Sequence, residues 1–192
     1  MISGIILASG LSRRMGTDKL LLPVKGVPVI ERVVAAATKS KLGEVILVCS
    51  SDSVANIGKK YLTKIVENNA PEMGQSHSIR LGVINSCQSA EGLMFLVGDQ
   101  PFITEGIINK LIESFTHENC SAVVPMYNGI KGNPVIFHSK LRDKLMNLSG
   151  DSGGRVLLKE LEDITTVSFD DAKPGMDIDT REDYEAMKML ED

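Results

Sequence analysis

A basic, glycine-containing loop directly follows the first hydrophobic segment of the chain. It runs from Leu7 to Lys19 with the sequence L-A-S-G-L-S-R-R-M-G-T-D-K. Its glycines allow sharp turns, and successive backbone N–H groups in such a loop can form an anion-binding hollow. Arg13, Arg14 and Lys19 add positive charges that suit phosphate oxygens. The spacing is neither G-x-G-x-x-G nor G-x-x-x-x-G-K-[ST]. The loop therefore predicts phosphate binding without a dinucleotide motif or a P-loop, and a solvated basic turn is the alternative.

Carboxylates follow predicted strands at two later points. Asp99 lies in G-D-Q-P, directly after the most hydrophobic segment, Leu93 to Val97. Asp177 and Asp179 belong to D-I-D-T, and alternation along an extended chain places them on the same side. Carboxylate oxygens are hard ligands that suit Mg²⁺, which takes one or two of them together with substrate phosphates. Aspartate equally favours turns and helix caps, so a purely structural role stays open for each of them.

The composition is that of an ordinary globular chain. The 192 residues are 43% hydrophobic and 24% charged, with a net charge of −4, and this length predicts one domain. The negative charge argues against a nucleic-acid polymer as partner, because proteins that bind one carry a basic surface. The scattered cysteines, odd in number, favour free thiols in a reducing compartment. Without a signal-peptide pattern or an apolar run of membrane-spanning length, we expect a cytoplasmic protein.

Short β-branched segments alternate with longer amphipathic segments along the whole chain. The expected strands are 1–7, 45–49, 64–67, 93–97, 122–125, 134–137 and 164–169. The expected helices are 29–40, 53–61, 76–87, 104–116, 139–148, 153–161 and 180–190, the last with Thr180 as its N-cap. This alternation predicts an α/β fold with a mostly parallel, doubly wound sheet, as a single domain over residues 1–192. Ligands of such sheets bind beyond the carboxyl ends of the strands, where the basic loop begins.

The loop and the L-L-L-P that follows it resemble the opening signature of the molybdenum cofactor cytidylyltransferases and their guanylyltransferase relatives, within the MobA-like NTP transferase superfamily. Further matches occur in order at G-Q-S-H-S-I-R-L-G (74–82), G-D-Q-P (98–101), P-M-Y-N-G-I-K-G-N-P (125–134), G-D-S-G-G-R (150–155) and D-I-D-T-R-E-D-Y (177–184). Several ordered matches are more specific than any single one. The resemblance implies a Rossmann-like fold of the nucleotide-diphospho-sugar transferase type.

The resemblance also implies an activity. Members of this family use Mg²⁺ to transfer CMP from CTP to the phosphate of molybdenum-loaded molybdopterin, which releases pyrophosphate and forms a cytosine dinucleotide cofactor. GTP or another nucleotide donor, and a sugar-phosphate or alditol-phosphate acceptor, are alternatives on the same fold. A recipient molybdoenzyme is the expected protein partner. In a different class, the chain would be a non-catalytic maturation factor that binds the molybdenum cofactor for such an enzyme.

The resemblance assigns roles to individual residues. The implied catalytic residues are Arg14, Lys19 and Asp99, and the implied Mg²⁺ ligands are Asp99 and Asp179. The implied nucleotide-binding residues are Leu7, Ala8, Ser9, Gly10, Arg14, Lys19, Asn68 and Ser78. The candidate acceptor loops contribute Gly132, Asn133, Gly150 and Asp151. Ser9 stands where cytosine-using relatives tend to carry Ala and guanine-using relatives Gly, so a β-carbon here predicts a preference for CTP. Asn69 and Asn133 depart from the Pro and His that relatives often show.

Overall fold

The computed structural model describes residues 1–10, 16, 18–118 and 120–190. Within them, eight strands form one sheet in the order β10-β7-β9-β6-β1-β4-β5, with β8 paired to β7. Their bounds are β1 Ile2–Ala8, β4 Glu44–Cys49, β5 Lys64–Glu67, β6 Gly92–Val97, β7 Ala122–Tyr127, β8 Ile130–Lys131, β9 Val135–His138 and β10 Ile164–Phe169. Strand β9 runs antiparallel to both β6 and β7. The neighbours of β1, the β4–β5 pair and the β7–β10 pair are parallel. The predicted mostly parallel sheet is confirmed.

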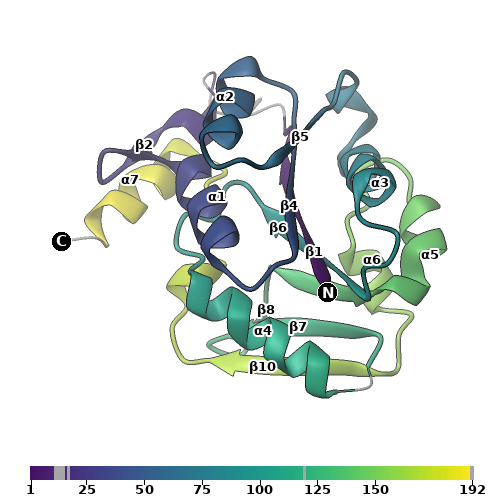
Figure 1. Ribbon diagram of the computed structural model, residues 1–192. Helices are drawn as coiled ribbons and strands as arrows, with labels where there is room; N and C mark the ends of the chain where they lie inside the picture. The colour runs from purple at the N-terminus through teal and green to yellow at the C-terminus, as the bar shows by residue number, and fades with distance from the viewer. Residues whose placement is uncertain (11–15, 17, 119, 191–192) are drawn as a thin grey trace.

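Helices cover both faces of the sheet. Their bounds are α1 Val29–Lys39, α2 Asp52–Lys60, α3 Gln75–Asn85, α4 Glu105–His117, α5 Arg142–Met146, α6 Arg155–Leu158 and α7 Arg181–Met189. Figure 1 shows α1, α2 and α4 on one side of the central strands and α3, α5 and α6 on the other. This is the doubly wound arrangement that the strand–helix alternation predicts. Among the described residues, no helix has the length and apolar character needed to cross a membrane.

Neighbouring residues of the central strand β1 contribute their side chains to two separate hydrophobic cores, one on each face of the sheet. Ile6 packs with the apolar faces of α1, α2 and α4, whereas Ile5 packs with those of α3 and α5, because successive side chains of a strand point to opposite faces. Helix α3 approaches β1 closely at Gly82, where an added β-carbon would collide with the Ile5 side chain. The N-terminal turn of α3 is thereby held near the carboxyl end of β1.

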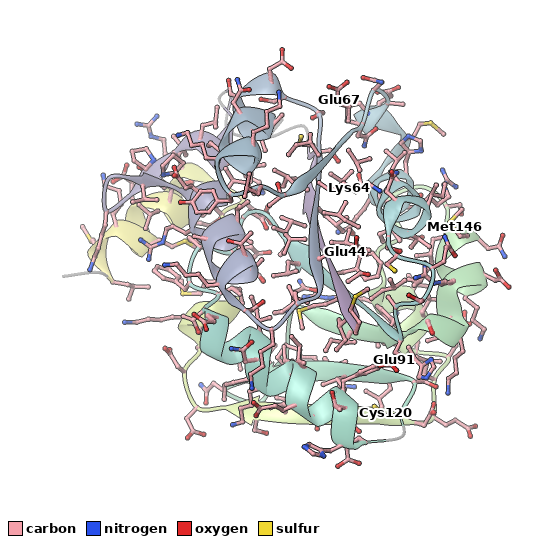
Figure 2. All side chains as sticks on the ribbon, viewed as in Figure 1. Glu44, Lys64, Glu67, Glu91, Cys120 and Met146 are labelled. Carbon is pink, nitrogen blue, oxygen red and sulfur yellow. The ribbon has the colours of Figure 1, made fainter. Side chains whose placement is uncertain are left out.

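Polar contacts from two neighbouring elements, α5 and β5, fix the C-terminal end of α3. Arg142, the first residue of α5, donates to the carbonyl of Val83 at 3.2 Å and to that of Cys87 at 2.6 Å. Lys64 of β5 donates to the carbonyl of Asn85 at 2.6 Å, and Figure 2 shows it lying between β5 and α3. These donors satisfy carbonyls that a helix terminus leaves without an intrahelical partner.

The structure differs from the sequence-based prediction at the two-residue strand β8, which is not predicted, and in three further segments. A hairpin of β2 (Pro23–Val24) and β3 (Val27–Pro28) is present where no strand is predicted. The helix expected over 139–148 is divided into a 3₁₀ turn, Ser139–Leu141, and α5, since the ring of His138 accepts from the Lys140 N–H and starts the tighter turn. The helix expected over 153–161 is reduced to the single turn α6, because Gly153 packs against the Gln75 side chain instead of entering a helix.

Candidate active site

A cavity of about 400 Å³ opens beyond the carboxyl ends of β1 and β6. Two segments that resemble family motifs, the start of the basic loop and G-D-Q-P, form one side of it. Its wall is made by Leu7, Ala8, Ser9, Gly10, Lys19, Leu20, Pro71, Glu72, Gly74, Gln75, Ser78, Val97, Gly98, Asp99 and Asp151. The position agrees with the rule that parallel sheets bind ligands at the carboxyl ends of their strands.

Lys19 joins two carboxylates from distant parts of the chain. Its Nζ donates to Asp99 Oδ2 at 2.8 Å and to Asp179 Oδ1 at 3.0 Å. Burial by itself lowers the pKa of Lys19, but the charge and hydrogen bond of Asp99, followed by those of Asp179, outweigh burial and leave this pKa above its ordinary value. The ammonium therefore stays charged, and the three side chains form one electrostatic unit, of which Lys19 and Asp99 line the cavity.

The local fold explains how Lys19 and Asp99 arrive at this point. Asp18 accepts from the Leu20 N–H at 3.1 Å and begins the 3₁₀ turn Lys19–Leu21, while the buried Leu20 side chain anchors that turn in the core. Gly98 donates to the Leu7 carbonyl at 2.9 Å, and a β-carbon on it would lie 3.0 Å from the Ile30 side chain. Only glycine fits this approach without displacing neighbours, so β6 delivers Asp99 directly beside β1.

Contacts made by Ile178 and Tyr184, near the end of the described chain, hold Asp179 beside Lys19. The N–H of Ile178 donates to the Asp99 carbonyl at 3.3 Å, and the Ile178 side chain is buried with those of Tyr184 and Val24. The Tyr184 hydroxyl donates to the Pro23 carbonyl at 2.7 Å, which ties α7 to the β2–β3 hairpin. The predicted Thr180 N-cap is confirmed, and with Asp183 it forms a reciprocal capping box that orients the start of α7.

A third carboxylate, Asp177, lies close to this group. Burial raises the pKa of Asp177 above its ordinary value, and the nearby charge of Asp99 raises it further. Asp177 lines a second cavity that also contains Asp99. The D-I-D-T segment thus turns both of its carboxylates toward the same region, as alternation along an extended chain predicts.

The two carboxylates fit a divalent cation whose remaining ligands are water and the phosphate oxygens of a substrate. Asp99 Oδ2 and Asp179 Oδ1 converge on one ammonium nitrogen, so the same two oxygens can face one metal ion. Within the part of the chain that the structure describes, no group of three or more His, Cys, Asp or Glu side chains is arranged to hold a metal. Mg²⁺ typically takes one or two carboxylates and completes its shell with water and substrate phosphates.

A buried polar cluster connects three segments behind the first cavity. The hydroxyls of Ser9 and Ser78 lie 2.6 Å apart, and the Asn68 amide Nδ2 lies 3.1 Å from each of them. All three side chains belong to residues that are at most 5% exposed. Ser9 and Ser78 line the cavity, whereas Asn68 lies behind them and is not part of its wall. The resemblance implies Asn68 as a nucleotide contact; in the structure its amide nitrogen lies against the two serines.

The second cavity, of about 370 Å³, adjoins the first. The two cavities share Leu7, Gln75, Val97, Asp99 and Asp151. The remaining wall of the second is formed by Ile79, Phe95, Asn133, Val135, Phe137, Gly153, Gly154, Arg155 and Asp177. A ligand in each cavity would therefore meet the other beside Asp99.

The two predicted acceptor loops are held by specific contacts around this second cavity. Asn133 lines it, and the Asn133 carbonyl accepts from the Tyr127 hydroxyl at 2.8 Å while Gly132 packs against the Tyr127 ring. The Gly150 carbonyl accepts from the Ser76 N–H at 3.1 Å, which docks the second loop on the start of α3. Gly132 and Gly150 thus shape the loops, and Asn133 and Asp151 are the members that line the cavity.

The structure brings most of the sequence-predicted residues together. Those that line the first cavity are Leu7, Ala8, Ser9, Gly10, Lys19, Ser78, Asp99 and Asp151. Arg14 lies outside the described residues. Pro71, Glu72 and Gln75 also line the first cavity and are not among the predicted site residues. Gln75 belongs to the G-Q-S-H-S motif, which could have indicated it, whereas nothing in the sequence marks Pro71 or Glu72.

The fold and the site together define a nucleotidyltransferase of the α/β class. Residues 4–164 match the family described as MobA-like NTP transferase domain, and the chain belongs to this family. The resemblance inferred from the sequence motifs is confirmed at this level.

Individual relatives agree with this assignment. The chain is 31% identical to the purine catabolism protein PucB of Bacillus subtilis (strain 168), over 96% of the chain and 95% of the relative. It is 27% identical to a probable molybdenum cofactor guanylyltransferase of Bacillus anthracis (strain CDC 684 / NRRL 3495), over 95% and 93% of the two chains. Among solved structures, a homologue of Mycobacterium tuberculosis rv0371c from Mycobacterium sp. strain JC1 has a TM-score of 0.87 at 27% identity, covering 98% of this chain and 96% of that one.

Proposed function

We propose that this enzyme transfers CMP from CTP to the phosphate of a molybdenum-loaded molybdopterin, releasing pyrophosphate and forming a cytosine dinucleotide cofactor. The observation that carries the proposal is the Lys19 ammonium held between Asp99 and Asp179 on the wall of the cavity that also contains Ser9. This arrangement supplies both signs of charge that a metal–triphosphate complex requires. The proposed unit is a single nucleotidyltransferase domain over residues 1–192.

The chemistry requires alignment and charge neutralisation more than acid–base catalysis. The attacking phosphate is already ionised near neutral pH, since the second pKa of a phosphomonoester is about 6. Accordingly, the described walls of both cavities contain no His or Cys. In the proposed mechanism, Lys19 binds the β- and γ-phosphates and stabilises charge on the leaving pyrophosphate, a role that Arg14 shares.

Asp99 and Asp179 would hold the divalent cation, which we take to be Mg²⁺. When bound, the ion neutralises phosphate charge and orients the triphosphate toward the acceptor. The described carboxylates supply only part of a coordination shell, so in this proposal they bind the ion together with the nucleotide. Gly10, Ala8 and Leu7 line the same cavity and would contact the nucleotide beside the carboxyl end of β1.

We assign the second cavity to the acceptor. It adjoins the first at Asp99, so in this proposal the acceptor phosphate lies next to the triphosphate. Phe95, Val135 and Phe137 form an apolar part of its wall that can hold a flat ring, and Asp151, Arg155 and Asp177 add polar groups for the rest of an acceptor. The name of the relative from Bacillus anthracis, a probable molybdenum cofactor guanylyltransferase, supports a molybdopterin-type acceptor, and we propose a molybdoenzyme as the recipient of the product. Three free cysteines suit a reducing compartment, so we place the enzyme in the cytoplasm.

GTP is the second candidate donor, because the relative from Bacillus anthracis is named a guanylyltransferase. The deciding experiment is release of pyrophosphate by the purified protein with Mg²⁺, molybdenum-loaded molybdopterin and each nucleoside triphosphate in turn. We expect the greatest kcat/KM with CTP. A preference for GTP would identify GTP, and not CTP, as the donor. Tight binding of the molybdenum cofactor without pyrophosphate release from any nucleotide would identify a maturation factor instead of an enzyme.

A further inference from the structure

We propose that Lys19 makes the site specific for a divalent cation and a triphosphate that bind together, because its ammonium is the counter-ion of the two carboxylates that would hold the metal. Without a nucleotide, Lys19 pairs with Asp99 and Asp179 and keeps a free metal ion from binding tightly. The outer phosphates of a nucleotide give the ammonium new partners and release the carboxylates. The inference rests on the proposed function and adds the condition under which its metal binds.

The Lys19 ammonium contacts the same carboxylate oxygens that a metal ion would use. Its Nζ lies 2.8 Å from Asp99 Oδ2 and 3.0 Å from Asp179 Oδ1. A Mg²⁺ ion bound to both oxygens would lie about 2.1 Å from each, and therefore within about 5 Å of the ammonium in its present position. A dication and an ammonium at this separation repel each other, so the metal and the ion pair compete.

This competition is strong because water screens the lysine poorly. The side chains of Lys19 and Asp99 are only 14% and 20% exposed, and charges that are partly buried interact with little screening. A free metal ion has two ways to bind, and both are unfavourable. It lies beside the ammonium, or it separates a largely buried charge from two of its carboxylate partners.

A triphosphate removes both obstacles. Lys19 lines the first cavity, and its flexible four-carbon stem lets the ammonium turn from the carboxylates toward phosphates bound there. The same phosphates complete the coordination shell of the metal, of which the described carboxylates supply only part. Metal and triphosphate therefore strengthen each other's binding, and this coupling is reciprocal. A nucleoside monophosphate lacks the outer phosphates and should not produce the effect.

The test measures binding of Mn²⁺, which takes the same oxygen ligands as Mg²⁺ and is paramagnetic. Enhanced relaxation of water protons distinguishes Mn²⁺ on the full-length protein from Mn²⁺–CTP in solution, because a protein-bound ion tumbles slowly. We expect weak binding of Mn²⁺ alone and tight binding with CTP, but not with CMP. In Lys19→Met, which keeps the length of the side chain and removes its charge, Mn²⁺ alone should bind at least about tenfold more tightly, since it no longer competes with a charge-assisted hydrogen bond.

Three further variants separate competition at this site from a general effect of charge. Lys19→Arg keeps the charge, so Mn²⁺ alone should bind as weakly as to the unmodified protein. Lys41→Met is the matched control, because it removes a positive charge from an exposed pair with Glu113 outside both cavities, and it should leave Mn²⁺ binding unchanged. Asp179→Asn added to Lys19→Met should abolish the gain in affinity, which would assign the Mn²⁺ site to the two carboxylates.

Thermal unfolding gives a second readout and checks that Lys19→Met folds. The variant leaves Asp99 and Asp179 facing each other without the ammonium between them. A ligand that binds only the folded state raises the unfolding midpoint in proportion to how far it saturates its site. Mn²⁺ without nucleotide should therefore raise the midpoint of Lys19→Met more than that of the unmodified protein.

The outcomes distinguish the inference from the proposed function. Equal affinity of the unmodified protein and Lys19→Met for Mn²⁺ alone would overturn the inference and leave nucleotidyl transfer standing. Tight Mn²⁺ binding by Lys19→Met that persists after Asp179→Asn would overturn it as well, because the ion would then lie elsewhere. Failure of the unmodified protein to bind Mn²⁺ in the presence of CTP would remove the proposed metal-dependent function and the inference together.

Discussion

The ammonium of Lys19 lies 2.8 Å from Asp99 Oδ2, although the two residues are 80 positions apart in the chain. Both side chains are largely buried, with exposed fractions of 14% and 20%. Ion pairs of this kind depend on both partners, because removal of one leaves a poorly hydrated charge behind. The contact therefore links the basic loop and the metal-binding carboxylate of the proposed mechanism, and a change in either is expected to affect the other.

The first prediction tests the proposed metal ligand. Asp99→Asn keeps the size of the side chain and removes its charge, so Mg²⁺-dependent turnover should fall by at least about 100-fold while the thermal unfolding transition stays cooperative. Glu113→Gln is the control. Glu113 lies on α4 and forms an exposed ion pair with Lys41, so this change also removes one negative charge. Near-normal turnover of Asp99→Asn would show that Asp99 only shapes the turn after β6.

The second prediction concerns the triphosphate. Lys19→Ala should weaken CTP binding by roughly 1.5–3 kcal/mol, the usual contribution of a hydrogen bond to a charged group. CMP binding should change much less, because CMP lacks the β- and γ-phosphates that Lys19 is proposed to hold. Equilibrium titrations with both nucleotides give the comparison. An equal loss for CTP and CMP would contradict a contact with the outer phosphates.

The third prediction separates the size of Ser9 from its hydroxyl. Ser9→Gly removes the β-carbon as well as the hydroxyl, whereas Ser9→Ala removes the hydroxyl alone. If space beside the β-carbon excludes a purine, the preference for CTP over GTP should shrink in Ser9→Gly and persist in Ser9→Ala. Competition between the two nucleotides for the same acceptor measures this preference. A parallel response of both variants would refute the steric explanation.

The fourth prediction addresses the acceptor loop. Tyr127→Phe leaves the half-buried Asn133 carbonyl without its 2.8 Å hydrogen bond, which should destabilise the protein by about 1 kcal/mol and raise the KM for the acceptor several-fold. The KM for CTP should stay unchanged, since Asn133 lines only the second cavity. Tyr61→Phe removes a hydroxyl that donates to Glu31 far from both cavities and serves as control. A matching rise in both KM values would place Tyr127 outside a specific acceptor role.

The sequence predicts the strands and helices with strong periodicity, and it misses the β2–β3 hairpin. Each strand of that hairpin has only two residues, too few to show alternation. The turn between the two strands does contain a residue type that indicates it, Gly26. Lys25 and Gly26 both have positive φ, at 48° and 74°, as the two central residues of a tight hairpin turn require. A glycine between two valines of opposite strands could have indicated it.

The site is predictable where its residues belong to one motif and unpredictable where they meet from different motifs. The basic loop and Asp99 follow strands that the hydrophobic pattern identifies. The contact between Ser9 and Asn68 spans 59 residues, and that between Ser9 and Ser78 spans 69. Such contacts depend on the order of strands in the sheet and on the close approach of α3 to β1 at Gly82. Periodicity along the chain carries no information about either.

The hydrogen bond from Tyr184 to the Pro23 carbonyl has a consequence for synthesis of the protein. Translation releases Lys19 and Asp99 early, but Asp179 lies 160 residues after Lys19 and is tied in place only when α7 docks on the hairpin. A nascent chain on the ribosome can therefore form most of the sheet while the charge cluster still lacks one of its carboxylates. Premature termination after β10 but before residue 179 would yield a fragment that contains every described strand of the sheet but lacks Asp179, so the pair of carboxylates proposed to bind the metal is completed only by the segment translated after the last strand.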